Sequence, residues 1–182
     1  MNLRRATISD IREIKSLADA LVVEPGDSSK VTGFYDYSLT EDQYSHRILS
    51  PFFFIAESHK GLEGFGMAYN SEFAKKLTEQ EPLLNEDALL GYLNQLRENY
   101  VYIDQLAVKE PGTNKSSLAA YLLINRIINE TRNSKIPYLL GAVSHKPWEN
   151  VSVVKFAKKS GSELQQEVNS RGIIFGVYKL SL

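Results

Sequence analysis

The segment from Val101 to Leu123 constrains the fold of this chain most, because it joins an apolar run to a polar turn and then to a helix-like pattern. From its second residue it reads YIDQLAVKEPGTNKSSLAAYLL. A strand that ends in backbone amides at a helix N-terminus forms a site for anions. The turn contains one glycine, two serines and a lysine, so the segment favours a phosphate-bearing cofactor.

Composition excludes several classes of site. The chain has 182 residues, 43% of them hydrophobic and 24% charged, which is typical of one soluble domain with a sizeable core. It contains no cysteine, so disulfides, thiolate metal ligands and a cysteine nucleophile are excluded. Its three histidines are scattered, so we expect no metal site. We expect neither a signal segment nor a membrane helix, and a cytoplasmic location.

Charge is distributed unevenly along the chain. Residues 1–91 carry 9 Lys+Arg and 15 Asp+Glu, a balance of −6, whereas residues 92–182 carry 12 and 7, a balance of +5. An acidic half suits a cationic substrate and a basic half suits an anionic cofactor. The alternative is ordinary variation in surface charge, because folding mixes the two halves. The chain has no basic run and a pI near 6.3, which disfavours nucleic-acid binding.

Hydrophobic periodicity and turn residues predict a mixed α/β chain. Ser9 is the expected cap of the first helix, Thr40 caps a short second helix, and Gly161 ends the last one. In the strand that begins at Phe52, alternation puts Phe53 on one face and Phe52 and Phe54 on the other. The expected strands are 3–6, 52–57, 65–70, 101–108, 138–144, 163–168 and 172–180. The expected helices are 11–21, 40–49, 117–133 and 150–160, with a polar, mostly helical stretch at 71–99.

Four segments, taken in order, resemble the GNAT superfamily of acyl-CoA-dependent N-acetyltransferases. They are LRRATISDIREIKSLA, FFFIAESHKGLEGFGMAYN, IDQLAVKE and HKPWENVSVVKFAKKSG. The resemblance covers nearly the whole chain apart from the stretch at about 71–99. It implies one GNAT-like domain over 1–182 with an insertion at that stretch. It also implies an α/β (α+β) fold with a mixed, mostly antiparallel central sheet flanked by helices.

The chain departs from the family pattern at two places. The family's phosphate loop reads Gln/Arg-x-x-Gly-x-Gly/Ala, and the best match here is Asn114–Ala119 after one extra residue. Asn114 replaces the Gln/Arg and Ser117 replaces the first glycine. Serine is small and keeps a donor, so a working loop is compatible with this change. The second departure is Ala157, at the position where many members place a tyrosine general acid.

By this resemblance, acetyl-CoA is the co-substrate and an unidentified primary amine, in a small molecule or a peptide, is the acceptor that attacks it directly. Main chain at Leu106, Ala107 and Val108 would pair with the pantetheine arm. The pyrophosphate would lie on the loop, and Asn150 would bond the arm or cap a helix. Lys115 can add a phosphate contact. The implied loop residues are Thr113, Asn114, Lys115, Ser116, Ser117, Leu118 and Ala119.

Acetyl transfer to an amine needs a group that removes a proton and one that protonates the leaving thiolate. Asp104 is the first candidate base, with Glu57 and His145 as the others. Each has a structural alternative: a paired strand acid, a solvated strand end and a surface loop histidine. Tyr121, Tyr138 and Tyr178 are the tyrosines that can substitute for the missing acid, or they belong to the core.

Two functions from different classes stay open. One is an N-acetyltransferase; the other is a non-catalytic GNAT-fold domain that binds acyl-CoA or a protein, suggested by the altered loop and the missing tyrosine. A nucleotide-binding P-loop is rejected because Gly-x-x-x-x-Gly-Lys-Ser/Thr is absent. The acceptor would be chosen by loops at 24–50 and 71–99. The hairpin at 163–182 can offer an edge for a homodimer.

Overall fold

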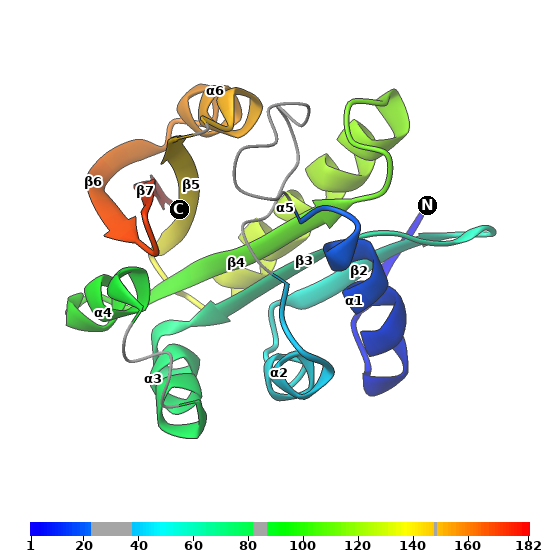
Figure 1. The fold of residues 1–182 in the computed structure, drawn as a ribbon, viewed down its shortest axis with the longest axis horizontal. Helices are drawn as coiled ribbons and strands as arrows, with labels where there is room; N and C mark the ends of the chain where they lie inside the picture. Colours follow the sequence, from blue (N-terminus) through cyan, green and yellow to red (C-terminus); the bar gives the residue numbers. More distant parts are fainter. Residues whose placement is uncertain (23–37, 82–86, 148) are drawn as a thin grey trace. The chain divides into compact units, whose positions relative to one another are not determined.

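The computed structural model describes residues 1–22, 38–81, 87–147 and 149–182 (Figure 1). In the loop at 24–50 that was expected to choose the acceptor, residues 24–37 lie outside the described residues. The strands are β1 Asn2–Arg5, β2 Phe53–Ser58, β3 Gly61–Asn70, β4 Tyr100–Val108, β5 Tyr138–Lys146, β6 Glu163–Ser170 and β7 Ile173–Ser181. The helices are η1 Ile8–Asp10, α1 Ile11–Asp19, α2 Glu41–Arg47, α3 Ser71–Gln80, α4 Ala88–Gln95, α5 Asn114–Asn133 and α6 Val151–Lys159.

The strands form one seven-stranded sheet in the order β1-β2-β3-β4-β5-β7-β6. The pairs β1–β2, β2–β3, β5–β7 and β6–β7 are antiparallel, whereas β4 and β5 run parallel. A parallel pair needs a crossover connection, and α5 supplies it between β4 and β5. The predicted fold class, a mixed and mostly antiparallel sheet flanked by helices, is confirmed.

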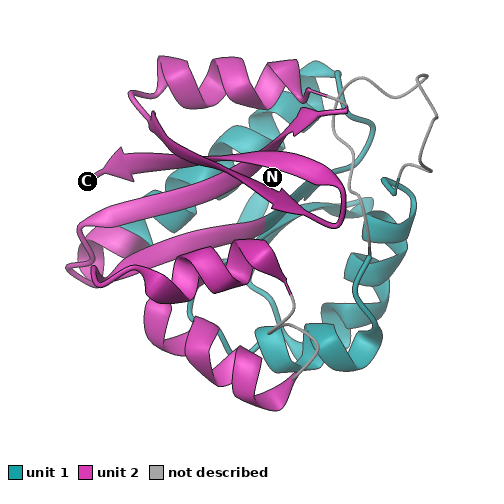
Figure 2. Cartoon of the chain, turned by 60° about the vertical axis from the view of Figure 1, so that its left-hand side comes forward, with its two compact units in different colours: residues 1–68, 105–130 teal, residues 69–104, 131–182 magenta. Residues whose placement is uncertain are grey.

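The chain divides into two compact units (Figure 2). Unit 1 comprises residues 1–68 and 105–130, and unit 2 comprises residues 69–104 and 131–182. Strands β3 and β4 each contribute residues to both units. The insertion expected at 71–99 belongs to unit 2 and contains α3 and α4.

In unit 1, helices cover both faces of the strands. Phe53 and Phe65 are buried in the cluster that α1 and α2 complete. Gly66, which alternates with Phe65, faces Leu123 and Ile127 of α5. The guanidinium of Arg126, also on α5, lies 5.1 Å from the centroid of the Phe54 ring. Phe53 and Phe54 therefore lie on opposite faces, as alternation predicted.

In unit 2, β7 pairs with β5 and β6 pairs with β7. Helices α3 and α4 contribute residues to the apolar cluster of this unit. The largest cluster contains Tyr69, Leu77, Leu93, Tyr100, Leu140 and Val177. A smaller cluster under α6 contains Val143, Val154 and Tyr178, with Ala157 packed against it. This smaller cluster gives Tyr178 an apolar surrounding.

Several expected boundaries were wrong. Helix α5 begins at Asn114, three residues before the expected start at Ser117, so most of the predicted loop is the first turn of a helix. Strand β3 begins at Gly61, four residues before the expected start at residue 65. Ser9 is not the cap of the first helix, because Thr7 forms a capping box with Asp10. Thr40 caps α2 as predicted, since its side chain accepts from the Gln43 amide.

Gly161 also behaves as predicted, following α6 with a φ of +82°. Within the described residues, none of the helices combines the length and the apolar character needed to cross a bilayer.

Candidate functional site

The end of β4 has one backbone edge directed toward β3. The Lys109 amide donates to the Glu63 carbonyl of β3 at 2.8 Å, and the Ala107 carbonyl lies against Gly64. Backbone groups of alternate residues in a strand point to opposite sides. Leu106 and Val108 therefore direct their amides and carbonyls away from β3. Among the described residues, the pairing of β4 with β5 ends at Ile103. The amides and carbonyls of Leu106 and Val108 therefore have no strand partner in that pairing.

The first turn of α5 is held by two side chains. The Thr113 hydroxyl accepts from the Ser116 amide at 3.2 Å, and the Ser116 hydroxyl donates to the Thr113 carbonyl at 2.8 Å. The Ser117 hydroxyl donates to the same carbonyl at 3.0 Å. Within the described part of the chain, no acceptor is recorded for the amides of Asn114 and Lys115. These two amides can hold an anion at the helix start.

Side chains of the predicted loop point in two directions. Ser116 and Ala119 are buried, at 4% and 1% exposure, so they stabilise the helix and leave no side-chain contact for a ligand. Asn114, Lys115 and Ser117 are exposed, and Leu118 is 50% exposed. Any anion at this helix would therefore be bound mainly by backbone, with the exposed side chains around it.

Lys115 has an acidic partner. Its Nζ lies 2.5 Å from Oε1 of Glu63, whose side chain is only 6% exposed. Glu63 also accepts a short hydrogen bond from the Ser58 hydroxyl. Hydrogen bonds from Lys115 and then Ser58 hold the pKa of Glu63 below its usual value despite its burial. The lysine that the sequence predicts to contact a phosphate is thus fixed beside the helix start by β3.

The predicted carboxylate bases lie in different surroundings. Asp104 is half-buried on β4, in unit 2. Glu57, on β2 in unit 1, accepts from Asn2 Nδ2 at 2.9 Å on one oxygen and from Arg4 Nε at 3.1 Å on the other. Both oxygens of Glu57 are thus held by donors from β1.

Asn150 precedes α6 and has the structural role that the sequence also allowed. Its Oδ1 accepts from the Val153 amide at 3.4 Å, and its own amide donates to the Ser144 carbonyl at 3.0 Å. It is 8% exposed. Its predicted bond to the arm of acetyl-CoA remains a prediction.

His145 is not a free loop residue. It lies in β5, where Nδ1 is 2.7 Å from Oε1 of Glu167 on β6 and Nε2 is 3.1 Å from Oη of Tyr178 on β7. The structural alternative for this histidine, a surface loop, is therefore wrong. Among the other tyrosines considered, Tyr121 is 57% exposed on α5.

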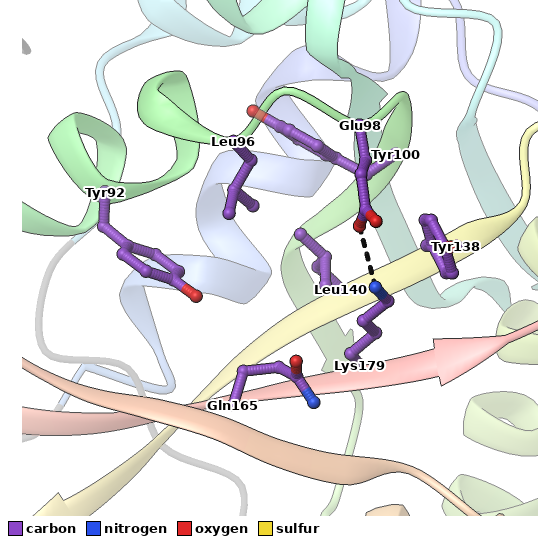
Figure 3. Close-up of a pocket in the computed structure, with 8 residues that line it drawn as sticks. All are labelled: Tyr92, Leu96, Glu98, Tyr100, Tyr138, Leu140, Gln165 and Lys179. Atoms are coloured by element: carbon purple, nitrogen blue, oxygen red, sulfur yellow. Dashed lines mark hydrogen bonds and ion pairs between the residues drawn. The ribbon is translucent and has the colours of Figure 1, made fainter.

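Unit 2 also has a hollow of about 50 Å³ lined by tyrosines and a charged pair (Figure 3). Lys179 Nζ lies 2.7 Å from Oε2 of Glu98 and 3.5 Å from the centroid of the Tyr138 ring. Burial raises the pKa of Tyr100 to about 12, and its hydroxyl donates to the Leu93 carbonyl at 3.2 Å. Because these polar groups satisfy one another, the hollow is a weak candidate for a reaction site.

Sequence reasoning did not identify Glu63 as the partner of Lys115 or Glu167 as the partner of His145. It also missed Gly176, where an added Cβ would meet the His145 ring. Each is an ordinary strand residue, and no local motif distinguishes it. Among the described residues, no group of three or more His, Asp or Glu is arranged to hold a metal ion.

Comparisons with known proteins agree on the fold. No family model and no curated protein matches the sequence. Among solved structures, Naa50 of Arabidopsis thaliana, in complex with the bisubstrate analogue CoA-Ac-MVNAL, matches with a TM-score of 0.65 and 16% identity, over 100% of this chain and 98% of that one. A ribosomal-protein-alanine N-acetyltransferase from Brucella melitensis matches with a TM-score of 0.63 and 12% identity, over 100% of both chains.

A GNAT-family acetyltransferase from Listeria monocytogenes matches with a TM-score of 0.62 and 13% identity, over 100% of this chain and 94% of that one. These identities are low, so the matches concern the fold. The chain has the fold of the GNAT N-acetyltransferases, and the predicted resemblance is confirmed at that level.

Proposed function

We propose that this protein is an N-acetyltransferase that transfers an acetyl group from acetyl-CoA to a primary amine by direct attack. The observation that carries the proposal is the backbone of unit 1 from Leu106 to Lys115. It combines a strand edge directed away from β3 with two amides at the start of α5. A strand edge suits the amide groups of the pantetheine arm, and a helix start suits a pyrophosphate.

The exposed side chains beside the helix start are consistent with an anionic ligand. Lys115 is 51% exposed at its side chain and can turn from Glu63 toward a phosphate. The remaining loop residues, Thr113 and Ser116, keep the turn in shape through their hydroxyls. In this proposal Ser117, in place of the family's glycine, is tolerated because its side chain bonds back to the Thr113 carbonyl.

The reaction needs a group that accepts a proton from the amine and returns one to the thiolate. His145, Asp104 and Glu57 are the proposed candidates, and the geometry favours His145. Its imidazole already contacts a carboxylate and a hydroxyl, and imidazole is the side chain used most often in general acid–base catalysis. Glu57 is the weakest of the three, since Asn2 and Arg4 occupy both of its oxygens.

A peptide N-terminus is the first acceptor class to test. Two of the similar proteins are Naa50, in complex with the bisubstrate analogue CoA-Ac-MVNAL, and a ribosomal-protein-alanine N-acetyltransferase. A small-molecule amine is the second class. The homodimer predicted through residues 163–182 stays a prediction; β6 is an edge strand of the sheet.

The alternative is a non-catalytic GNAT-fold domain that binds acyl-CoA without turnover or binds a protein. The observation that favours it is Ala157, which supplies no hydroxyl where the family pattern has a tyrosine. Binding alone does not separate the two functions, but turnover does.

The test begins with calorimetric titration of acetyl-CoA and CoA into the purified full chain. Micromolar binding is expected. Release of free thiol is then followed with acetyl-CoA and the peptide MVNAL, an alanine-initiated peptide, or a small primary amine. Turnover above the rate without acceptor supports the enzyme. Binding without turnover supports the acyl-CoA-binding form of the alternative. No binding at millimolar CoA rejects the enzyme and favours the protein-binding form.

A further inference from the structure

Glu63 occupies an irregular position in β3. Ala56 of β2 pairs with Gly64 of β3, and the next residue of β2, Glu57, pairs with Leu62. Glu63 is therefore an extra residue at a shift in register, which makes it a β-bulge. A bulge turns a side chain away from the regular alternation of the strand, and here the carboxylate reaches the first turn of α5.

The carboxylate of Glu63 is buried and held by two donors in unit 1. Lys115 Nζ lies 2.5 Å from Oε1, and the Ser58 hydroxyl donates to the same oxygen. Ser58 is itself fixed, because its hydroxyl accepts from the Lys60 amide at 3.1 Å in the turn between β2 and β3. The bonds from Lys115 and then Ser58 keep the pKa of Glu63 low, so Glu63 carries its negative charge at neutral pH.

Lys115 can meet a phosphate in two ways: it can leave Glu63, or it can keep that bond and use its other donors. Leaving would remove the hydrogen-bonded cation from a carboxylate that is only 6% exposed, which is costly for a buried charge. Keeping the bond leaves two of the three N–H donors of the ammonium for a ligand. The Lys115 side chain is 51% exposed, so these donors can reach an anion at the surface. The second way is therefore favoured.

We infer that Glu63 is a positioning residue of the proposed acetyl-CoA site, which anchors the Lys115 ammonium at the start of α5 so that its free donors bind a phosphate of the cofactor. This inference rests on the proposed acetyltransferase function and identifies a residue of its cofactor site. Glu63 acts through Lys115 and meets no part of the cofactor itself. A ligand without phosphate should therefore be insensitive to Glu63.

The first test is Glu63→Gln, which keeps the size of the side chain and removes its charge. We expect CoA to bind about fivefold more weakly in calorimetry, as for loss of order in one half-exposed charged contact. Pantetheine, which carries the thiol arm without phosphates, should bind the variant and the wild type equally. General damage to the fold would weaken both ligands. In thiol release, KM for acetyl-CoA should rise with kcat unchanged.

Two further variants separate an action through Lys115 from a general effect of charge. Lys115→Gln should weaken CoA binding at least as much as Glu63→Gln. The double variant should bind CoA no more weakly than Lys115→Gln alone, because the two residues act as one unit. The matched control is Asp19→Asn on α1 of unit 1, where Asp19 forms an exposed pair with Lys15 at 2.8 Å. It should bind CoA as the wild type does, and circular dichroism checks the folding of each variant.

The second test needs no turnover. Carbon-13 NMR follows the titration of the Glu63 carboxyl group with and without CoA, and the signal is assigned by its loss in Glu63→Gln. If Lys115 keeps its bond, the pKa of Glu63 stays below its usual value in the complex. If Lys115 leaves, the strongest cause of the lowered pKa is lost while the burial remains, so the pKa rises above the usual value. We expect the first result.

The outcomes separate the anchor from the function. Equal or tighter CoA binding by Glu63→Gln would overturn the anchor and leave the proposed enzyme intact, and so would an equal loss for pantetheine. CoA binding that depends on Glu63 without turnover of any acceptor would reject the enzyme and support the anchor. Absence of CoA binding by the wild type would reject the enzyme and the anchor together.

Discussion

The start of α5 in unit 1 and the bulge of β5 at His145 in unit 2 differ in which groups they present to a ligand. At the helix start the available groups are backbone amides, and the side chains of Thr113 and Ser116 serve to shape the turn. At the bulge the available groups are side chains, and the backbone irregularity serves to direct one of them. Backbone sites tolerate sequence change, whereas side-chain sites depend on residue identity.

The carboxylates of the two regions differ in how deeply they are buried relative to their partners. In unit 1 the buried partner is the carboxylate of Glu63, at 6% exposure, and Lys115 is 51% exposed. In unit 2 the less exposed partner is the imidazole of His145, and the carboxylate of Glu167 is 50% exposed. The first pair keeps a fixed charge at neutral pH, because the pKa of Glu63 is lowered. The second pair joins an imidazole to a carboxylate, and imidazole is the side chain used most often in general acid–base catalysis.

The largest expected effect comes from breaking the backbone arrangement of unit 1 with Gly64→Ala. An added Cβ would lie 2.6 Å from the Ala107 carbonyl and 3.3 Å from Cα of Val108, so the end of β4 must move. We expect the free energy of unfolding to fall by about 1–3 kcal/mol, as for overpacked cores. The affinity for CoA should fall at least tenfold. Urea unfolding and calorimetry measure the two quantities.

Gly91→Ala is the matched control. Gly91 lies in α4 and an added Cβ there meets nothing within 4 Å. Alanine in a helix interior is favoured over glycine by about 0.5–1 kcal/mol, so this variant should be slightly more stable and bind CoA as the wild type does. Unchanged CoA binding by Gly64→Ala would remove the β4 edge from the proposed cofactor site.

The second largest effect on stability is expected from Glu63→Gln, which removes the charge of the buried carboxylate. At pH 7 we expect a loss of about 1 kcal/mol of stability, since a charge-assisted bond is removed but Lys115 is half-exposed. The folded pKa of Glu63 is lowered, so its contribution is complete above the unfolded pKa and disappears as pH falls through the folded pKa. Urea unfolding at pH 7 and at acid pH measures it.

The difference between wild type and Glu63→Gln should therefore be largest at neutral pH and vanish in acid. Glu72→Gln is the control, because Glu72 forms an exposed pair with Lys76 on α3. It should leave the stability at the wild-type value at any pH, because a fully exposed pair is screened by solvent. An equal difference at pH 7 and in acid would show that the charge of Glu63 contributes nothing.

Much of the fold was predictable because it follows from local periodicity. The strand expected at 101–108 is β4 Tyr100–Val108, and Thr40 caps its helix as the sequence indicated. The start of α5 was misplaced because Asn114 and Ser116 favour turns in isolation. The hydroxyl of Thr113 caps the turn and offsets that preference. The cap at Ser9 was wrong because Thr7 and Asp10 bond each other three residues apart.

The candidate sites were predictable only in part. Backbone alternation near Leu106 and Val108 follows from strand geometry, so the pantetheine edge needed no special side chain. His145 was identified by residue type alone. Its partners Glu167, Tyr178 and Gly176 depend on how β5, β6 and β7 align, and the register shift at His145 alters that alignment. A sequence pattern does not fix such a shift.

The smallest effect on stability is expected at Asn150. Among the predicted cofactor ligands, this residue lies in unit 2 and also caps a helix. Asn150→Ala removes a cap whose bond to the Val153 amide is long, 3.4 Å, so we expect a loss of about 0.5 kcal/mol in urea unfolding. Asn150→Asp retains the capping oxygen but removes the amide donor, and should keep the stability. If the side chain also bonds the arm of CoA, both variants weaken CoA binding severalfold in calorimetry. Wild-type affinity in both would assign Asn150 to the helix alone, and side-chain recognition of CoA would then lie elsewhere.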